Sequence, residues 1–158
     1  MGALSRSPHA DPLAVLHEVF GYFSFRGDQA AIVDAVIAGQ SGLVVMPTGA
    51  GKSLCYQLPA LLRPGVAVVV SPLIALMSDQ VDALRLLGVS AAAYNSMLTP
   101  QERDEIRWQL REGTLDLIYV APEGLMLGDT LQMFAEMPVS LFAIDEAHCV
   151  SEIGRAHV

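Results

Sequence analysis

The chain has 158 residues, of which 53% are apolar and 16% are charged, and its formal net charge is −8. This length predicts one domain with a sizeable core, and no apolar run reaches the ~18–20 residues of a membrane helix. The acidic balance argues against a protein that holds nucleic acid by bulk positive charge, because phosphate neutralisation supplies most non-specific affinity.

The two cysteines, Cys55 and Cys149, lie far apart without the C-x-x-C spacing of a zinc site, so we expect reduced thiols. Residues 1–10 are expected to be a disordered leader. They lack the apolar core of a signal peptide, which favours a cytoplasmic protein. Asp11 and Pro12 then predict the start of a short amphipathic helix that stops at Gly21, because Asp can cap a helix and Pro suits its first turn.

An aromatic segment over 20–25 follows, with Arg26 and Gln29 behind it. By periodicity it is a hydrophobic staple ahead of a second helix over 30–38. The alternative is a base-reading element, since a Gln amide can match the edge of adenine and an aromatic ring or an Arg plane can stack on the base.

The stretch 46–53 reads Met-Pro-Thr-Gly-Ala-Gly-Lys-Ser, between an apolar run and an apolar, helix-compatible segment. Gly49 and Gly51 let the backbone curl so that N–H groups point inward at a helix N-terminus and bind phosphate oxygens. Lys52 is expected to reach the β- and γ-phosphates and Ser53 to ligate Mg²⁺. It is a Walker A loop with methionine in place of its first glycine; the alternative is a glycine-rich turn that binds nothing.

From residue 42 onward the sequence alternates apolar strands with amphipathic helices. Strands are expected near 42–46, 66–70, 89–93, 115–120 and 139–144, and helices near 53–62, 73–87, 100–112 and 122–136, the last broken at Gly128. This alternation predicts right-handed βαβ units and therefore an α/β fold, a parallel sheet with helices on both faces.

Polar turns follow three of these strands, at 71–72, 95–96 and 119–123. Ligands of open α/β sheets bind at the carboxyl ends of the strands. Small side chains and N–H groups there can hold a nucleic-acid backbone without net positive charge. The alternative for the first turn is an ordinary capped helix whose residues Leu73, Leu76, Met77, Gln80, Leu84 and Leu87 are patterned for burial.

Asp145 and Glu146 directly follow the apolar run 141–144. Two adjacent acids there are costly unless they are ionised and used. In a Walker B role Asp145 holds Mg²⁺ and Glu146 deprotonates the attacking water. The alternative is a helix start, where the dipole favours acids. His148 could sense the phosphate or a partner lobe.

Together these strings resemble the first motor lobe of a RecQ-family DNA helicase, a RecA-like P-loop domain, over residues 11–151. The matching pieces are Phe20-Gly21-Tyr22, Phe25-Arg26 and Gln29; MPTGAGKSLCYQL from Met46 to Leu58; VVSPLIALMSDQV from Val69 to Val81; Asn95-Ser96; Tyr119-Val120 with Pro122-Glu123; and DEAHCVS from Asp145 to Ser151. The segment after the lysine, SLCYQLP, separates this family from most other superfamily-two motors.

The resemblance implies ATP and Mg²⁺ as cofactors and 3′-to-5′ unwinding of DNA in recombination and repair. It implies adenine recognition by Tyr22, Arg26 and Gln29, and phosphate binding by Thr48, Gly49, Ala50, Gly51, Lys52 and Ser53. It implies that Ser53 and Asp145 ligate Mg²⁺, that Lys52, Asp145 and Glu146 are catalytic, and that His148 couples the two activities. It also implies contacts to single-stranded or partly duplex DNA by Ser71, Pro72, Leu73, Gln80, Asn95 and Ser96.

The resemblance stops after Ser151. The family continues into an aromatic-rich loop, a second motor lobe with an arginine finger, and zinc-binding and winged-helix regions. We therefore expect a truncated lobe that binds ATP but hydrolyses it slowly without its second lobe. Residues 152–158 are expected to be a non-native tail, since their codons can spell a sequencing-library adapter. The alternatives are another nucleic-acid translocase, an RNA helicase, or an inactive nucleotide-binding module.

Overall fold

The computed structural model describes residues 11–40, 51–126 and 128–145. The chain divides into two compact units, Met1–Pro64 and Gly65–Val158. The expected leader, the expected strand at 42–46 and the expected tail lie outside the described residues. Of the described helices, none is both long enough and apolar enough to cross a membrane.

The first unit is helical in its described residues. Its elements are α1 (Pro12–Val15), the π-helical turn η1 (Leu16–Phe20), α2 (Gln29–Ile37) and α3 (Leu54–Leu62). The Leu13 N–H donates to Asp11 Oδ1 at 3.2 Å, and η1 ends at Gly21 with φ 73°. The predicted start at Asp11 and stop at Gly21 are therefore confirmed.

A small core holds these helices together. Its buried residues are Leu16, Val33, Leu54 and Leu58, with Phe20 and Phe25 among the partly buried side chains packed against it. Each buried aliphatic side chain contributes about 1.5–3 kcal/mol. The expected staple thus applies to Phe20 and Phe25, whereas Tyr22 and Phe23 are exposed.

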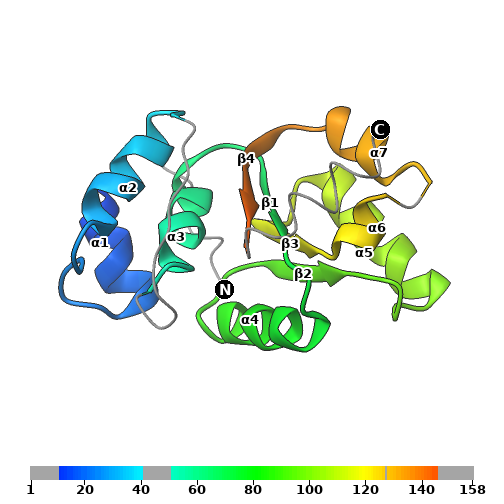
Figure 1. Ribbon diagram of the computed structural model, residues 1–158, viewed down its shortest axis with the longest axis horizontal. Coiled ribbons are helices and arrows are strands. Elements are labelled where there is room, and N and C mark those ends of the chain that lie inside the picture. The colour runs from blue at the N-terminus through cyan, green and yellow to red at the C-terminus, as the bar shows by residue number, and fades with distance from the viewer. Residues whose placement is uncertain (1–10, 41–50, 127, 146–158) are drawn as a thin grey trace. The chain divides into compact units, whose positions relative to one another are not determined.

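The second unit is built on a parallel sheet of four described strands in the order β2-β3-β1-β4 (Figure 1). The strands are β1 (Val66–Val70), β2 (Ala91–Tyr94), β3 (Leu117–Val120) and β4 (Val139–Ile144). In the ladder, Val68 lies beside Ile118 of β3 and Phe142 of β4. All five residues of β1 are buried, as expected of a parallel strand covered on both faces.

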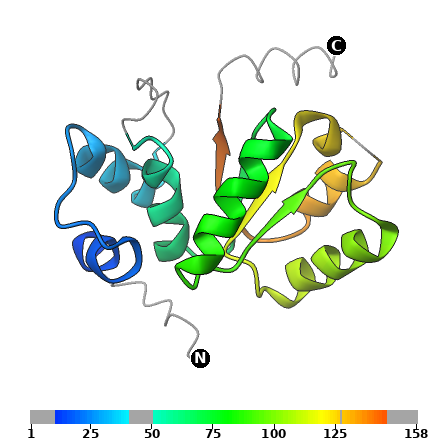
Figure 2. The ribbon, with the colours of Figure 1, turned by 90° about the horizontal axis from the view of Figure 1, so that it is seen from below.

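Helices cover both faces of this sheet, which confirms the predicted α/β layers (Figures 1 and 2). One face carries α4 (Ile74–Leu86); the other carries α5 (Pro100–Glu112), α6 (Pro122–Leu125) and α7 (Thr130–Ala135). The second face packs Ile106, Leu125 and Phe134 against the even-numbered residues of β1. The expected break in the last helix separates α6 from α7, and Gly128 between them has φ 48°.

A tight backbone contact joins the amino ends of β1 and β4. Gly65 has φ +100°, and a Cβ there would lie 2.6 Å from the Pro138 carbonyl oxygen and 3.0 Å from the Ser140 nitrogen. The register of the β1–β4 ladder shifts at this point, between Val66 and Ala67. Backbone atoms cannot move aside as a flexible side chain can, so this position requires glycine for two reasons.

We expect Gly65→Ala to lower the free energy of unfolding by about 1–3 kcal/mol more than Gly88→Ala does, because overpacking adds to the backbone strain. Gly88 is the matched control, since it has φ +84° but a Cβ added there would meet no atom within 4 Å. Urea denaturation of both variants measures the difference. Equal losses would show that conformation alone, and not the contact with Pro138, requires glycine at position 65.

Candidate functional site

The end of the predicted Walker loop lies at the start of α3. Gly51 has φ +74°, the left-handed conformation that an inward-curling loop needs. The Leu54 N–H donates to the Gly51 carbonyl at 3.2 Å, and the Gln57 N–H donates to the Ser53 carbonyl at 2.9 Å. Lys52 and Ser53 are half-buried at this helix start. Thr48, Gly49 and Ala50 lie outside the described residues.

Gln29 connects this loop to the aromatic segment. Its side chain is buried, Oε1 accepts the Arg26 N–H at 2.8 Å, and Nε2 donates to the Gly51 carbonyl at 3.2 Å. A Cβ on Gly51 would overlap Gln29 Nε2. The sequence predicts that Gln29 contacts adenine but does not predict its bond to Gly51, because no periodic pattern relates residues that lie 22 positions apart.

The other two predicted adenine contacts are exposed in the same unit. Tyr22 is 54% exposed, and its N–H donates to the Leu16 carbonyl at 3.2 Å. Arg26 is exposed as well, with its backbone N–H held by Gln29. The structure therefore connects Arg26 to Gly51 through one side chain, whereas the contacts of these residues with a base stay predictions.

Cys55 lies in the first turn of α3, directly after the loop. Its thiol is buried and is not part of a disulfide, and burial raises its pKa above the ordinary value because desolvation disfavours the thiolate. The thiol is therefore protonated at neutral pH. This agrees with the reduced cysteine expected from the sequence; Cys149 lies outside the described residues.

In the second unit, polar residues line the carboxyl edge of the sheet. Ser71 follows β1, Asn95 follows β2 and Asp145 follows β4, and all three are buried. The Ser71 N–H donates to the Val120 carbonyl at 3.0 Å, and the Asp145 N–H donates to the Val70 carbonyl at 2.8 Å. The structure thus brings these predicted residues to one edge. Glu146 and His148 lie outside the described residues.

Asn95 uses its side chain to hold its own turn. Its Oδ1 accepts the Met97 N–H at 2.9 Å, and its Nδ2 lies 3.9 Å from the Met77 sulfur. The next residue, Ser96, is exposed. Of the two residues predicted to contact DNA here, Ser96 is the accessible one, and Asn95 shapes the turn that presents it.

The helix after Ser71 buries fewer residues than its pattern suggests. Met77, Val81 and Leu84 are its buried side chains, and Gln80 is half-buried. The expected burial of the other apolar positions is wrong: Leu73, Leu76 and Leu87 are 53%, 38% and 40% exposed. Pro72 is half-buried and precedes the exposed Leu73, so the predicted DNA-contacting turn presents an apolar side chain.

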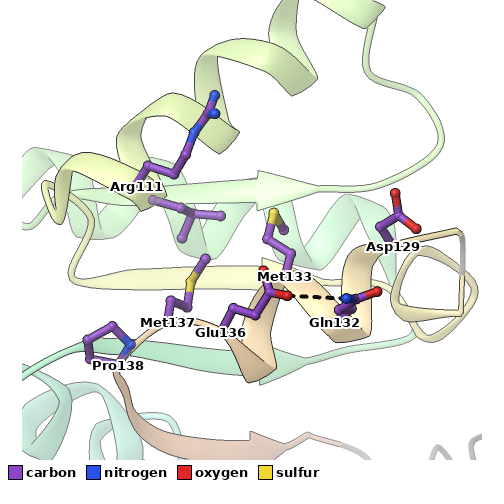
Figure 3. A pocket seen from close by; sticks show the side chains of 8 residues that line it. Arg111, Asp129, Gln132, Met133, Glu136, Met137 and Pro138 are labelled. Atoms are coloured by element: carbon purple, nitrogen blue, oxygen red, sulfur yellow. Dashed lines mark hydrogen bonds between the residues drawn. The ribbon is translucent and has the colours of Figure 1, made fainter.

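A cavity of about 520 Å³ lies elsewhere in the second unit, between α5 and α7 (Figure 3). Its lining includes Pro138, which lies just before β4. Gln132 donates to Glu136 at 3.2 Å, and the Arg111 guanidinium points away from the labelled side chains of α7 (Figure 3). None of the predicted site residues lines it.

The chain is similar in sequence to several proteins that are named as DNA helicases. ATP-dependent DNA helicase RecQ of Pasteurella multocida is 49% identical over 142 residues, which cover 90% of this chain and 22% of that protein. RecQ of Haemophilus influenzae is 48% identical, with coverage of 90% and 23%. The probable DNA helicase RecS of Bacillus subtilis is 43% identical, with coverage of 88% and 28%. The chain thus spans less than a third of the length of these relatives.

A solved structure agrees with the fold. The hypothetical ATP-dependent RNA helicase of Sulfolobus tokodaii matches with a TM-score of 0.67 at 19% identity, over 90% of this chain and 43% of that one. This confirms the expected RecA-like fold. Residues 26–158 match the family model of the DEAD/DEAH box helicase. The chain therefore belongs to the DEAD/DEAH box helicase family, and its particular resemblance to RecQ helicases is confirmed.

Proposed function

We propose that this chain is the ATP-binding motor lobe of a RecQ-type DNA helicase and that MgATP binds at the amino end of α3. The observation that carries the proposal is the Gln29 side chain, which bonds both the segment expected to read the base and the loop expected to hold the phosphates. The names of the relatives, ATP-dependent DNA helicases, support the same class.

Gln29 has hydrogen-bonding capacity left for a base. A carboxamide offers two lone pairs on oxygen and two N–H groups. The bonds to Arg26 and Gly51 use one of each. The second lone pair can accept from the adenine amino group while the second N–H donates to ring nitrogen N7, as Gln does at adenine edges in DNA. Gln29 can thus organise the loop and read adenine together.

The remaining roles follow the chemistry of the residue types. Lys52 neutralises the β- and γ-phosphates, Ser53 and Asp145 hold Mg²⁺, and Glu146 deprotonates the attacking water. Tyr22 and Arg26 offer planar groups to the base. His148 couples the phosphate state to the rest of the motor.

DNA is the proposed substrate, single-stranded or partly duplex, and it meets the carboxyl edge of the sheet. The 71–73 turn, Gln80 and the 95–96 turn supply the contacts, chiefly to the sugar-phosphate backbone. Movement in the 3′-to-5′ direction and a role in recombination and repair are proposed from the RecQ resemblance, as is a cytoplasmic location. In P-loop enzymes an arginine finger from a second lobe contributes roughly 10³–10⁵ in rate, so the proposed hydrolysis depends on that lobe.

Lys52→Ala is expected to weaken MgATP binding by roughly 10–100-fold, because a charge-assisted bond to phosphate is lost. Isothermal titration of the purified chain measures the dissociation constant. Arg111→Ala is the control, since it removes an exposed cation from the cavity of the second unit. Similar affinities for the Lys52 variant and the wild type would contradict a phosphate site at α3.

Gln29→Glu is expected to weaken MgATP binding by at least roughly tenfold. The carboxylate keeps an acceptor for the Arg26 N–H but places a charge against the Gly51 carbonyl, where an N–H donated before. The same titration applies. Gln40→Glu makes the same chemical change at an exposed position and controls for charge. A Gln29 variant that binds like the Gln40 variant would remove Gln29 from the site.

Glu146→Gln separates a motor from a binding module. In a protein that carries both lobes, we expect it to reduce DNA-stimulated ATP hydrolysis by roughly 10²–10⁴, the usual contribution of a general base, with MgATP affinity retained. Phosphate release and nucleotide titration give the two quantities. Unchanged hydrolysis would favour the module, and Glu112→Gln, an exposed acid at the end of α5, serves as the control.

A further inference from the structure

The exposed aromatic turn after η1 is held from three sides. Gly21 takes a left-handed conformation with φ 73°, and the Gly21 and Tyr22 N–H groups both donate to the Leu16 carbonyl. Phe25 packs on the core of the first unit. Between these fixed points lie the side chains of Tyr22 and Phe23, which are 54% and 94% exposed.

The third support is a side chain from the helical turn itself. Nε2 of His17 lies 2.6 Å from the Phe23 carbonyl oxygen, and the two rings have centroids 5.9 Å apart. A carbonyl oxygen only accepts, so His17 Nε2 carries the proton, in the neutral Nε2–H tautomer or in the imidazolium. The bond therefore ties the residue directly after Tyr22 to η1.

This bond constrains the backbone on the far side of Tyr22. The bond from the Tyr22 N–H holds the backbone on the amino side of Tyr22. The bond accepted by the Phe23 carbonyl holds the backbone on its carboxyl side. An exposed residue has few packing contacts to define its direction, so hydrogen bonds on both sides must do so. A residue that is already ordered before the ligand binds loses less conformational entropy on binding, so the free-energy cost of binding is lower.

We propose that His17 is a positioning residue for the base, acting through Tyr22. The inference rests on the proposed function, in which Tyr22 stacks on adenine. The geometry points to His17 because its hydrogen bond acts on the backbone and leaves the Tyr22 ring uncovered. His17 itself does not touch the nucleotide, so its effect on affinity must pass through the orientation of Tyr22.

A double-mutant cycle on MgATP affinity tests this route. We expect Tyr22→Ala to weaken binding roughly tenfold, as loss of one base stack does. His17→Ala should weaken it roughly three- to tenfold, as loss of one hydrogen bond does. In the Tyr22→Ala background, His17→Ala should have no further effect, because the residue through which it acts is gone.

Two further variants separate positioning from stability. His17→Gln restores an N–H donor and should bring the affinity to within roughly twofold of the wild type, while His17→Leu keeps bulk without a donor and should not. Glu18→Ala, an exposed neighbour on η1, is the control. The expected pattern appears in dissociation constants, whereas a structural role would appear only in thermal unfolding.

The outcomes are distinct. Additive effects of the two alanine variants, or equal affinities of the Gln and Leu variants, overturn the positioning role while leaving the nucleotide site intact. A Tyr22→Ala variant with wild-type affinity removes Tyr22 from the site and overturns the inference with it. The Lys52→Ala titration tests the proposed function itself, independently of the His17 and Tyr22 variants.

Discussion

The bond between the Gln29 side chain and the Gly51 carbonyl is the contact on which the proposed nucleotide site depends. Gly51 has a left-handed backbone with φ +74°, and the space beside its Cα is filled by the Gln29 amide. A residue with a Cβ at position 51 would therefore be strained and would also displace Gln29. One glycine thus permits both the left-handed backbone at position 51 and the close approach of the Gln29 side chain, which links Gly51 to the aromatic turn.

Much of the fold could be predicted because its signals are local. The run 66–70 is the buried strand β1, and Asp11 and Gly21 bound the first helical segment as capping chemistry requires. The third and fourth expected strands begin late, at 91 and 117, because the Ser90 N–H donates to the Asp116 carboxylate at 3.1 Å and the Ser90 carbonyl accepts from Asp116. A side chain that bonds a distant backbone leaves no periodic trace in the sequence.

The candidate site was predictable in its residue types but not in their contacts. The loop, the acids after β4 and the polar turns follow from spacing and from the position of strand ends. Two of these contacts depend on three-dimensional placement. The Gln29 side chain donates to the Gly51 carbonyl, and the Asn95 side-chain oxygen accepts the Met97 N–H. The exposure of Leu76 likewise reflects which side of α4 meets the sheet, and several registers of an apolar-rich helix satisfy the same pattern.

The carboxyl edge of the sheet bears on how an acidic lobe could hold DNA. The Ser71 N–H and the Asn95 side chain, two groups suited to phosphate, are already bonded within the protein. On the proposed function, the exposed Ser96 and the exposed, apolar Leu73 can touch the strand, and neither carries a positive charge. Binding through such groups releases few counterions, so affinity from this lobe would depend weakly on salt. A strong salt dependence in the whole motor would have to arise from basic residues elsewhere in it.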